Sequence, residues 1–109
     1  MSTSLIDDRK TDESREIEAL LKPHFAYVNC YRYNSAIVRL CVVDEQFRPM
    51  SQVQRHERIE PFLQQLSPDI QDELIYILLL APGEAHDVRY SQRYLEFMDP
   101  SPSILETLN

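Results

Sequence analysis

The side chains best suited to chemistry in this sequence are three histidines and two cysteines. A neutral imidazole suits iron and zinc, a thiolate binds the same metals, and a Cys–His pair also serves nucleophilic catalysis. His56 has the most informative neighbours, because Arg55 precedes it and Arg58 follows two residues later. Their positive charge opposes protonation of the imidazole and favours the neutral form that binds a metal. His56 is therefore the first candidate metal ligand.

The two cysteines are Cys30 and Cys41, and they do not form a C-x-x-C pair. This arrangement fits a reduced compartment better than a disulfide scaffold. Both stand in strand-like runs with apolar neighbours, where a thiol is usually buried and inert. Cys30 keeps two interpretations, a second ligand beside His56 or a buried thiol, whereas Cys41 belongs to the core. Because catalysis needs an accessible thiol, we expect no enzyme activity.

The other histidines, His24 and His86, stand far apart at the ends of segments and should face solvent. No spacing brings the three histidines together as a metal site. For His56 a structural interpretation also stays open, in which the side chain is half-buried on its helix and bonded to the backbone.

Arg55 and Arg58 likewise have two interpretations. They bind acidic groups of a partner beside His56, or they form surface salt bridges with Glu57 or Glu60. The first interpretation makes this part of the chain a partner-binding surface, and the second gives the arginines no functional role.

Charge and composition limit the function classes. The 109 residues include 11 Lys and Arg against 18 Asp and Glu, a net charge of −7. Nucleic-acid binding rests on a basic surface that neutralises phosphates, so it is disfavoured. A single glycine, Gly83, excludes glycine-rich phosphate loops.

No apolar run approaches the roughly 20 residues of a membrane span, and the N-terminus carries no export signal. We therefore expect a cytoplasmic protein without membrane contact.

Hydrophobic periodicity divides the middle of the chain into helices and strands. Apolar residues recur at helical spacing after Asp12, after Ser51 and, more briefly, before the last strand. Alternating side chains predict a strand over 27–33, and β-branched residues predict one over 37–43. A short apolar run closed by Pro82-Gly83 predicts a third strand over 74–80. The order α-β-β-α-α-β gives an α+β fold. A hairpin and a returning parallel strand then form a three-stranded mixed sheet with helices on one face.

The two ends of the chain differ from this middle part. Residues 1–12 are polar and charged, and we expect a disordered arm there. Residues 13–85 form the predicted domain. Residues 86–109 alternate charged side chains with aromatic and aliphatic ones. Because the open face of the sheet needs cover, we expect this extension to pack across the sheet or to form a homodimer interface.

Three short strings resemble the signature of the BolA-like family: Val42-Val-Asp-Glu-Gln-Phe47, Met50-Ser-Gln-Val53 and Arg55-His-Glu-Arg-Ile59. In that family a strand ends in an acidic turn and an aromatic residue, and the next helix carries an Arg-His pair before aliphatic residues. The resemblance covers about residues 14–85 and includes the α-β-β-α-α-β order. It implies a fold akin to one class of KH domain.

The resemblance implies a non-enzymatic adaptor that partners a monothiol glutaredoxin in iron–sulfur cluster or iron handling, with no cofactor held stably alone. The family's helix histidine, here His56, is then a ligand of a shared cluster, and a mixed thiolate and imidazole shell labilises such a cluster. The family's second ligand is a His or Cys in the first loop, but residues 34–36 contain neither, which leaves Cys30 as the substitute. Arg55, His56 and Arg58 form the implied partner-binding surface.

Two other functions stay open on the same scaffold. One is a stress-linked transcriptional regulator that binds nucleic acid through the KH-like fold. The other is a protein-interaction module without metal chemistry, in which His56 has no ligand role.

Overall fold

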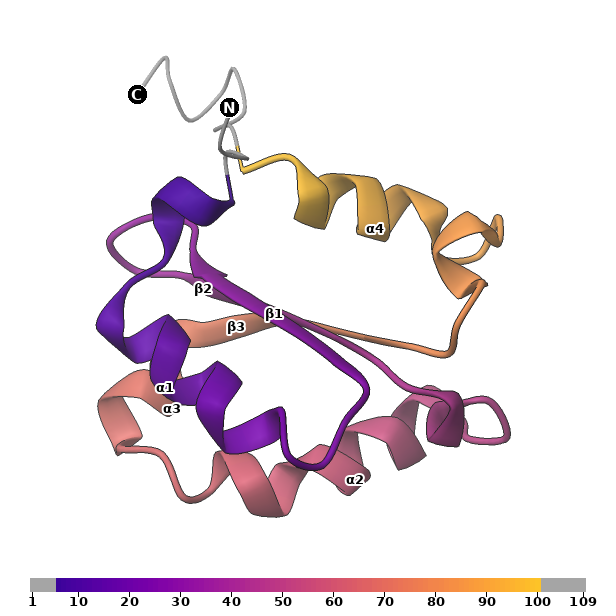
Figure 1. Ribbon diagram of the computed structural model, residues 1–109, viewed down its shortest axis with the longest axis horizontal. Helices are drawn as coiled ribbons and strands as arrows, with labels where there is room; N and C mark the ends of the chain where they lie inside the picture. The colour runs from indigo at the N-terminus through magenta and orange to yellow at the C-terminus, as the bar shows by residue number, and fades with distance from the viewer. Residues whose placement is uncertain (1–5, 101–109) are drawn as a thin grey trace.

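A three-stranded sheet lies between two helical layers in the computed structural model, which describes residues 6–100 (Figure 1). Within that range no helix has the length and apolar character needed to cross a bilayer. The elements are, in order, η1 (Asp7–Arg9), α1 (Asp12–Leu21), β1 (Tyr27–Arg32), β2 (Val38–Val43), η2 (Glu45–Phe47), α2 (Gln52–Leu63), α3 (Pro68–Glu73), β3 (Leu74–Leu80), η3 (Glu84–His86) and α4 (Ser91–Met98).

The sheet has the order β1-β2-β3, with β2 in the middle. β1 pairs antiparallel with β2 in register Tyr27 to Val43, and β3 pairs parallel with β2 after the crossover through α2 and α3. β2 is buried along nearly its whole length, which explains why its sequence is apolar on both faces. The predicted α+β class, element order and mixed sheet are confirmed.

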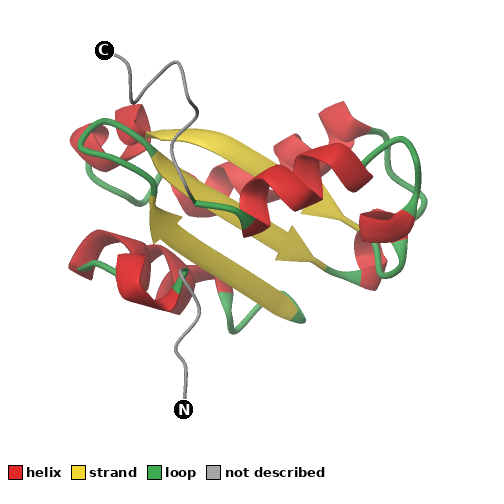
Figure 2. Ribbon diagram, turned by 90° about the horizontal axis from the view of Figure 1, so that it is seen from above, coloured by secondary structure: helices red, strands yellow, loops and turns green. Residues whose placement is uncertain are grey.

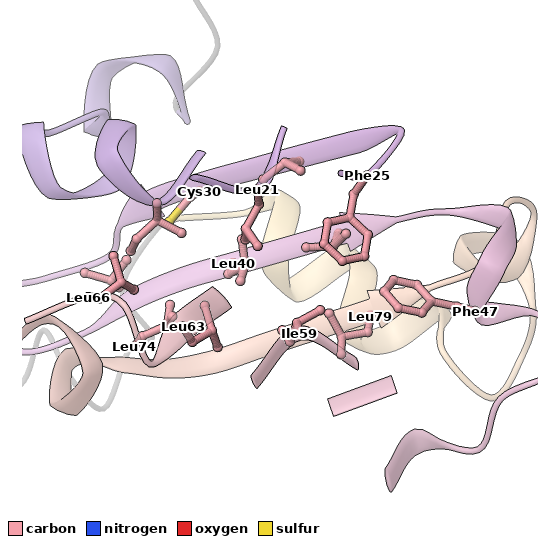
Figure 3. Close-up of a cluster of buried hydrophobic side chains, with 14 of the residues drawn as sticks. Leu21, Phe25, Cys30, Leu40, Phe47, Ile59, Leu63, Leu66, Leu74 and Leu79 are labelled. Atoms are coloured by element: carbon pink, nitrogen blue, oxygen red, sulfur yellow. The ribbon is translucent and has the colours of Figure 1, made fainter. Parts of the chain in front are cut away.

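Helices α1, α2 and α3 cover one face of the sheet. Their apolar side chains meet those of the strands in the main core, where Leu21 and Ile59 from the helices approach Leu40 and Leu79 from the sheet (Figure 3). Phe25 and Phe47 stack at one end of this core, with their ring centroids 5.7 Å apart. This layer holds α2 against the sheet and so fixes the position of the residues around His56.

The second face of the sheet is covered by α4, which lies on the opposite side from the other helices (Figures 1 and 2). Phe97 is fully buried there, and its carbonyl accepts a 2.5 Å hydrogen bond from the Tyr31 hydroxyl. Arg39 of β2 donates to the carbonyl of Glu96 at 3.0 Å. Of the two positions expected for the extension, its described part takes the one across the sheet. Residues 101–109 lie outside the described range.

The disordered arm predicted over residues 1–12 is corrected for residues 6–12. Ile6 is buried beside the second face of the sheet, and Arg9 donates to the carbonyl of Tyr33 at 2.7 Å. Thr11 caps α1, because its hydroxyl accepts the N–H of Ser14. These polar residues therefore have partners within the domain, which composition alone does not indicate. Residues 1–5 lie outside the described range.

Candidate functional site

Helix α2 carries His56 and begins with a reciprocal cap. The Ser51 hydroxyl accepts the N–H of Gln54 at 3.2 Å, and the Gln54 side chain accepts the N–H of Ser51 at 2.9 Å. This capping box satisfies two backbone donors that the first turn would otherwise leave unpaired. The helix therefore starts at a defined residue, and His56 projects from it one turn later.

The buried side of α2 consists of Arg55, Ile59 and Leu63, which recur every four residues. Helical spacing after Ser51 predicts that Val53 and His56 share an apolar stripe with Ile59, but the structure places both residues outside the buried side. A step of three residues falls about 60° short of a full helical turn, so two such steps back from Ile59 rotate the side chain out of the core. Val53 is consequently 67% exposed, and His56 is exposed as well.

The outer side of α2 forms a shallow groove of about 550 Å³. Val53 and Pro61 contribute apolar surface to it, and Glu57 and Glu60 contribute carboxylates. His56 is exposed, and neither a side chain nor a backbone group within residues 6–100 hydrogen-bonds to its imidazole, so the interpretation as a half-buried, backbone-bonded histidine is wrong. The residues that line the groove are Gln52, Val53, His56, Glu57, Glu60, Pro61 and Gln64.

Arg55 is turned into the protein and does not belong to this surface. It is 2% exposed, and its guanidinium forms a two-pronged ion pair with Glu84 at 2.6 and 3.0 Å. It also donates to the carbonyl of Leu79 at 3.0 Å. The planar guanidinium fork matches a carboxylate and a neighbouring carbonyl at once, which favours this buried position. Both sequence-based interpretations of Arg55, partner binding and surface salt bridging, are therefore corrected.

Glu84 completes this ion pair from the loop after β3. Its carboxylate also accepts the backbone N–H of Ala81 at 2.8 Å. The bonds from Arg55 lower the pKa of Glu84 below its ordinary value, with a further contribution from the Ala81 N–H, although burial acts in the opposite direction. Glu84 is thus ionised at neutral pH, and the pair ties α2 to the end of β3.

Arg58 contacts aromatic rings instead of carboxylates. Its guanidinium carbon lies 5.3 Å from the ring centroid of Phe25 and 5.6 Å from that of Phe62, within cation–π range. The ring of His24 is 4.6 Å from the same Phe62 ring. Arg58 forms no ion pair with any described residue, so the expected surface salt bridge is not present. It is half-buried and keeps part of its side chain accessible beside the groove.

The two cysteines are fully buried on opposite faces of the sheet. Cys30 belongs to the core beneath α1, and Cys41 belongs to the cluster beneath α4. Burial raises the pKa of the Cys30 thiol far above its usual range and that of Cys41 to about 12. Cys30 does not line the groove that contains His56. The structure therefore does not bring together the two residues that the sequence paired as ligands.

Metal ligands do not converge in the described part of the chain. Residues 6–100 contain no group of three or more His, Cys, Asp or Glu arranged to hold an ion. His24 and His86 are exposed, as expected, and neither lines the groove of His56. Of the three histidines, His56 is the one that lines the groove.

Comparisons with known proteins add no family to this geometry. No family model, curated protein or solved structure matches the chain. The resemblance to the BolA-like family accordingly stays a prediction from residues 42–59 and the order of elements.

Two parts of this site were missed by sequence reasoning. The first is the exposure of Val53, which the helical angle between Val53 and Ile59 would have revealed. The second is the role of Glu84 as the partner of Arg55. These two residues are 29 positions apart, and no local pattern links a helix arginine to a loop glutamate at that separation.

Proposed function

We propose that the chain is a non-enzymatic, cytoplasmic adaptor of the BolA-like type, which binds a monothiol glutaredoxin or a similar protein through the outer face of α2. Its role is in handling iron or an iron–sulfur cluster. The observation that carries the proposal is the position of His56, an exposed imidazole in an open groove with no internal hydrogen-bond partner among residues 6–100.

The surroundings of His56 support protein docking. Val53 is a large apolar side chain that is 67% exposed, one turn before His56 on the same side of the helix. Glu57 and Glu60 place negative charge beside it, which suits basic residues on a partner and steers their approach. On the reverse side, the buried Arg55 holds the helix to the sheet. An apolar contact flanked by charges on an anchored helix is typical of a helix-mediated interface.

Of the two cluster ligands that the sequence suggested, only His56 suits a shared iron–sulfur cluster. The His56 imidazole is accessible and of a type that binds iron. The Cys30 thiol is fully buried with a raised pKa, so the thiolate needed for ligation is disfavoured there. We therefore assign His56 as the single ligand from this chain, with the thiolates supplied by the partner. A mixed shell of that kind holds its cargo less tightly than thiolates alone.

The main alternative is a protein-interaction module without metal chemistry. It is favoured by the burial of both cysteines, which leaves no accessible thiol beside His56. The nucleic-acid-binding alternative has less support. Arg55 is buried, and Arg48 and Arg89 form ion pairs with Glu45 and Asp87, so three of the arginines that could form a basic patch are already engaged.

The decisive experiment is an anaerobic titration of a cluster-loaded monothiol glutaredoxin with this protein, followed by visible circular dichroism and absorbance. We expect a new chiral spectrum with the wild type and its loss with His56→Ala, because the imidazole is the ligand from this chain. His86→Ala is the matched control, since it removes another exposed imidazole outside the groove and should leave the spectrum unchanged.

Docking is tested separately from ligation by size-exclusion chromatography of the mixture. Val53→Lys should weaken the complex by at least about tenfold, since it places a charge at the apolar centre of the groove. A complex that forms without any spectral change would identify the module without metal chemistry. The absence of any complex with the wild type would sink the adaptor proposal.

A further inference from the structure

A buried arginine lies at the centre of the sheet face that α4 covers. Arg39 of β2 stands between Tyr31 of β1 and Tyr76 of β3 in the register of the sheet. Its guanidinium carbon lies 3.7 Å from the ring centroid of Tyr33 and 4.9 Å from that of Tyr76, within cation–π range. Arg39 is 7% exposed, so its charge is largely removed from water. A buried charge of this kind is costly unless it is paired with an anion.

The hydrogen bonds of this guanidinium use one of its three nitrogens. Nη1 donates to the Tyr31 hydroxyl and to the Glu96 carbonyl, each at 3.0 Å. Among residues 6–100, Nε has no hydrogen-bond partner although it is buried, Nη2 has none either, and no carboxylate forms an ion pair with Arg39. Nε and Nη2 carry the two parallel N–H groups that hold a carboxylate or a phosphate in a two-pronged contact. The described residues therefore leave this edge of Arg39 unused.

Arg55, which is also buried, shows the contrast. All three of its side-chain nitrogens donate hydrogen bonds, and two of them hold the Glu84 carboxylate. Its charge is thus balanced inside the protein. The acceptors that contact Arg39 are a hydroxyl and a carbonyl, which are neutral. A buried cation with a free two-pronged edge indicates a binding site for an anion.

The C-terminal end of α4 takes part of the place of that anion. The last carbonyls of a helix have no partner within the helix and carry the negative end of its dipole. Arg39 donates to the Glu96 carbonyl and Tyr31 to the Phe97 carbonyl, so side chains of the sheet satisfy this end of α4. A carbonyl carries only a partial charge, and it therefore stabilises a guanidinium less than a carboxylate or a phosphate does.

α4 is lightly anchored for a helix that covers a sheet face. It has eight residues, of which Phe97 is the buried one, and no side-chain hydrogen bond caps its N-terminus. Leu95 and Met98 are 67% and 41% exposed, and no ion pair within residues 6–100 joins α4 to the sheet. A two-turn helix without a cap is unstable on its own, because helix nucleation is costly. We therefore expect α4 to open more readily than the strands beneath it.

We propose that α4 is a lid over an oxyanion-binding site built on Arg39. When α4 opens, the Nε and Nη2 edge of the guanidinium binds a carboxylate or a phosphate group with two parallel hydrogen bonds. This contact satisfies the buried Nε–H and balances the charge, while the rings of Tyr33 and Tyr76 hold the guanidinium in place. α4 lies on the opposite side of the sheet from α2, so this site is separate from the groove on α2 (Figure 1).

The charges around Arg39 suit an anion once the lid is open. Arg9 donates to the Tyr33 carbonyl at 2.7 Å and, like Arg39, forms no ion pair with a described residue. Glu96, whose carbonyl contacts Arg39, belongs to α4, so opening of the lid moves its carboxylate away. Although the chain has a net charge of −7, this face then presents two unpaired arginines, which attract an anion.

NMR of the arginine Nε–H groups in the full chain tests the site, with inorganic phosphate and acetate as separate probes at constant ionic strength. We expect the Arg39 signal to shift and to saturate. The Arg55 signal should stay in place, because its Nε–H already donates to the Met50 carbonyl at 3.1 Å. The probe that shifts the Arg39 signal identifies the class of oxyanion that the site binds. No shift with either probe overturns the proposal.

Arg39→Lys tests the two-pronged contact, because lysine keeps the charge without the planar fork. Binding, followed by the backbone amide signals of β2, should weaken at least about tenfold in this variant. An unchanged affinity would contradict a site built on the guanidinium edge. Arg39→Lys should leave the glutaredoxin titration unchanged, since Arg39 and His56 belong to different faces, so the two proposals fail independently.

Phe97→Ala tests the lid, with Leu95→Ala as the matched control. Loss of the buried anchor raises the open fraction, so phosphate binding should tighten at least about tenfold. Leu95 is exposed on the same helix, and its loss should leave the affinity unchanged. Circular dichroism confirms that each variant is folded. In the wild type, α4 amides should exchange faster than those of β2. Equal affinities in the two variants, or equally slow exchange in α4 and β2, overturn the lid.

Discussion

Each edge of the sheet is closed by an ion pair from other elements, but the two edges are closed to different extents. At β1, the pair Lys10 and Glu18 satisfies both backbone groups of Cys30. At β3, the pair Arg55 and Glu84 closes the C-terminal end and leaves the strand before Leu79 open. In both cases the carboxylate accepts a strand N–H and the cation donates to a strand carbonyl, which imitates the hydrogen bonds of an adjacent strand.

This comparison indicates that the two ion pairs stabilise the fold mainly by satisfying backbone hydrogen-bonding groups at the sheet edges. An ion pair removed from water gains little over its desolvation cost, so coulombic attraction alone is a weak explanation for burying Arg55. An unpaired backbone group at a buried strand end is costly, and the fork of Arg55 satisfies one while Glu84 satisfies another. Which part of each edge stays open is therefore decided by charged side chains from other elements.

The largest effect is expected from breaking the Arg55–Glu84 ion pair, which we call the cap on β3. Arg55→Ala leaves Glu84 as an unpaired, largely buried carboxylate and the Leu79 carbonyl without its donor. We expect the free energy of unfolding to fall by about 3–5 kcal/mol, the range for removing one partner of a buried pair. Urea unfolding followed by far-ultraviolet circular dichroism measures this change.

Arg58→Ala is the control for that substitution, because it removes an arginine of the same helix that lies over the rings of Phe25 and Phe62 and forms no ion pair with a described residue. Its loss should cost roughly 0.5–1 kcal/mol. If Arg55→Ala and Arg58→Ala lower the free energy of unfolding equally, the bond from Arg55 to the strand backbone gives no extra stability.

An intermediate effect is expected from opening the other edge. Glu18→Ala removes the acceptor of the Cys30 N–H and the partner of Lys10. We expect a loss of about 1–3 kcal/mol, the range for leaving a buried donor unsatisfied, together with faster amide exchange at Cys30. Glu18→Gln keeps an acceptor oxygen and should preserve part of the protection. If Cys30 exchanges as slowly in Glu18→Ala as in the wild type, the side-chain cap is not what protects this edge.

Much of the fold was predictable because its signals are local. The strand predicted over 74–80 has the observed bounds, and the strand predicted over 27–33 ends one residue earlier in the structure. Periodicity reports which face of an element is apolar, and Pro68 after a serine reports where α3 begins. These features depend on neighbours within a few residues along the chain.

The two ion pairs that close the sheet edges, Lys10–Glu18 and Arg55–Glu84, were not predictable from such local signals. Lys10 stood in a segment expected to be disordered, because residues 1–12 are polar and charged and have little to bury. Arg55 stood beside nearby glutamates but reached Glu84 instead. Side-chain contacts across tens of residues depend on the assembled sheet, so sequence reasoning misassigned Arg55. Even α4 carried a readable signal, since Tyr90, Tyr94 and Phe97 recur at helical spacing.

The smallest expected effect concerns the response of the β3 cap to acid. The bonds from Arg55 lower the pKa of Glu84 in the folded protein. A carboxyl of this kind contributes stability that is complete above its unfolded pKa, about 4.3, and is lost as the pH falls through the lower folded value. In Glu84→Gln this contribution is absent at every pH. The gap in unfolding free energy between wild type and variant should therefore narrow below about pH 5.

Urea unfolding of both proteins across this pH range measures the gap, with Glu45→Gln as the control. Glu45 pairs with Arg48 in solvent. The difference in unfolding free energy between wild type and Glu45→Gln should therefore be small at every pH and should vanish at high salt. A gap for Glu84→Gln that does not change with pH would mean that the contacts of Glu84 do not depend on its charge. The cap on β3 would then owe nothing to ionisation, and its likeness to the Lys10–Glu18 cap on β1 would be one of shape alone.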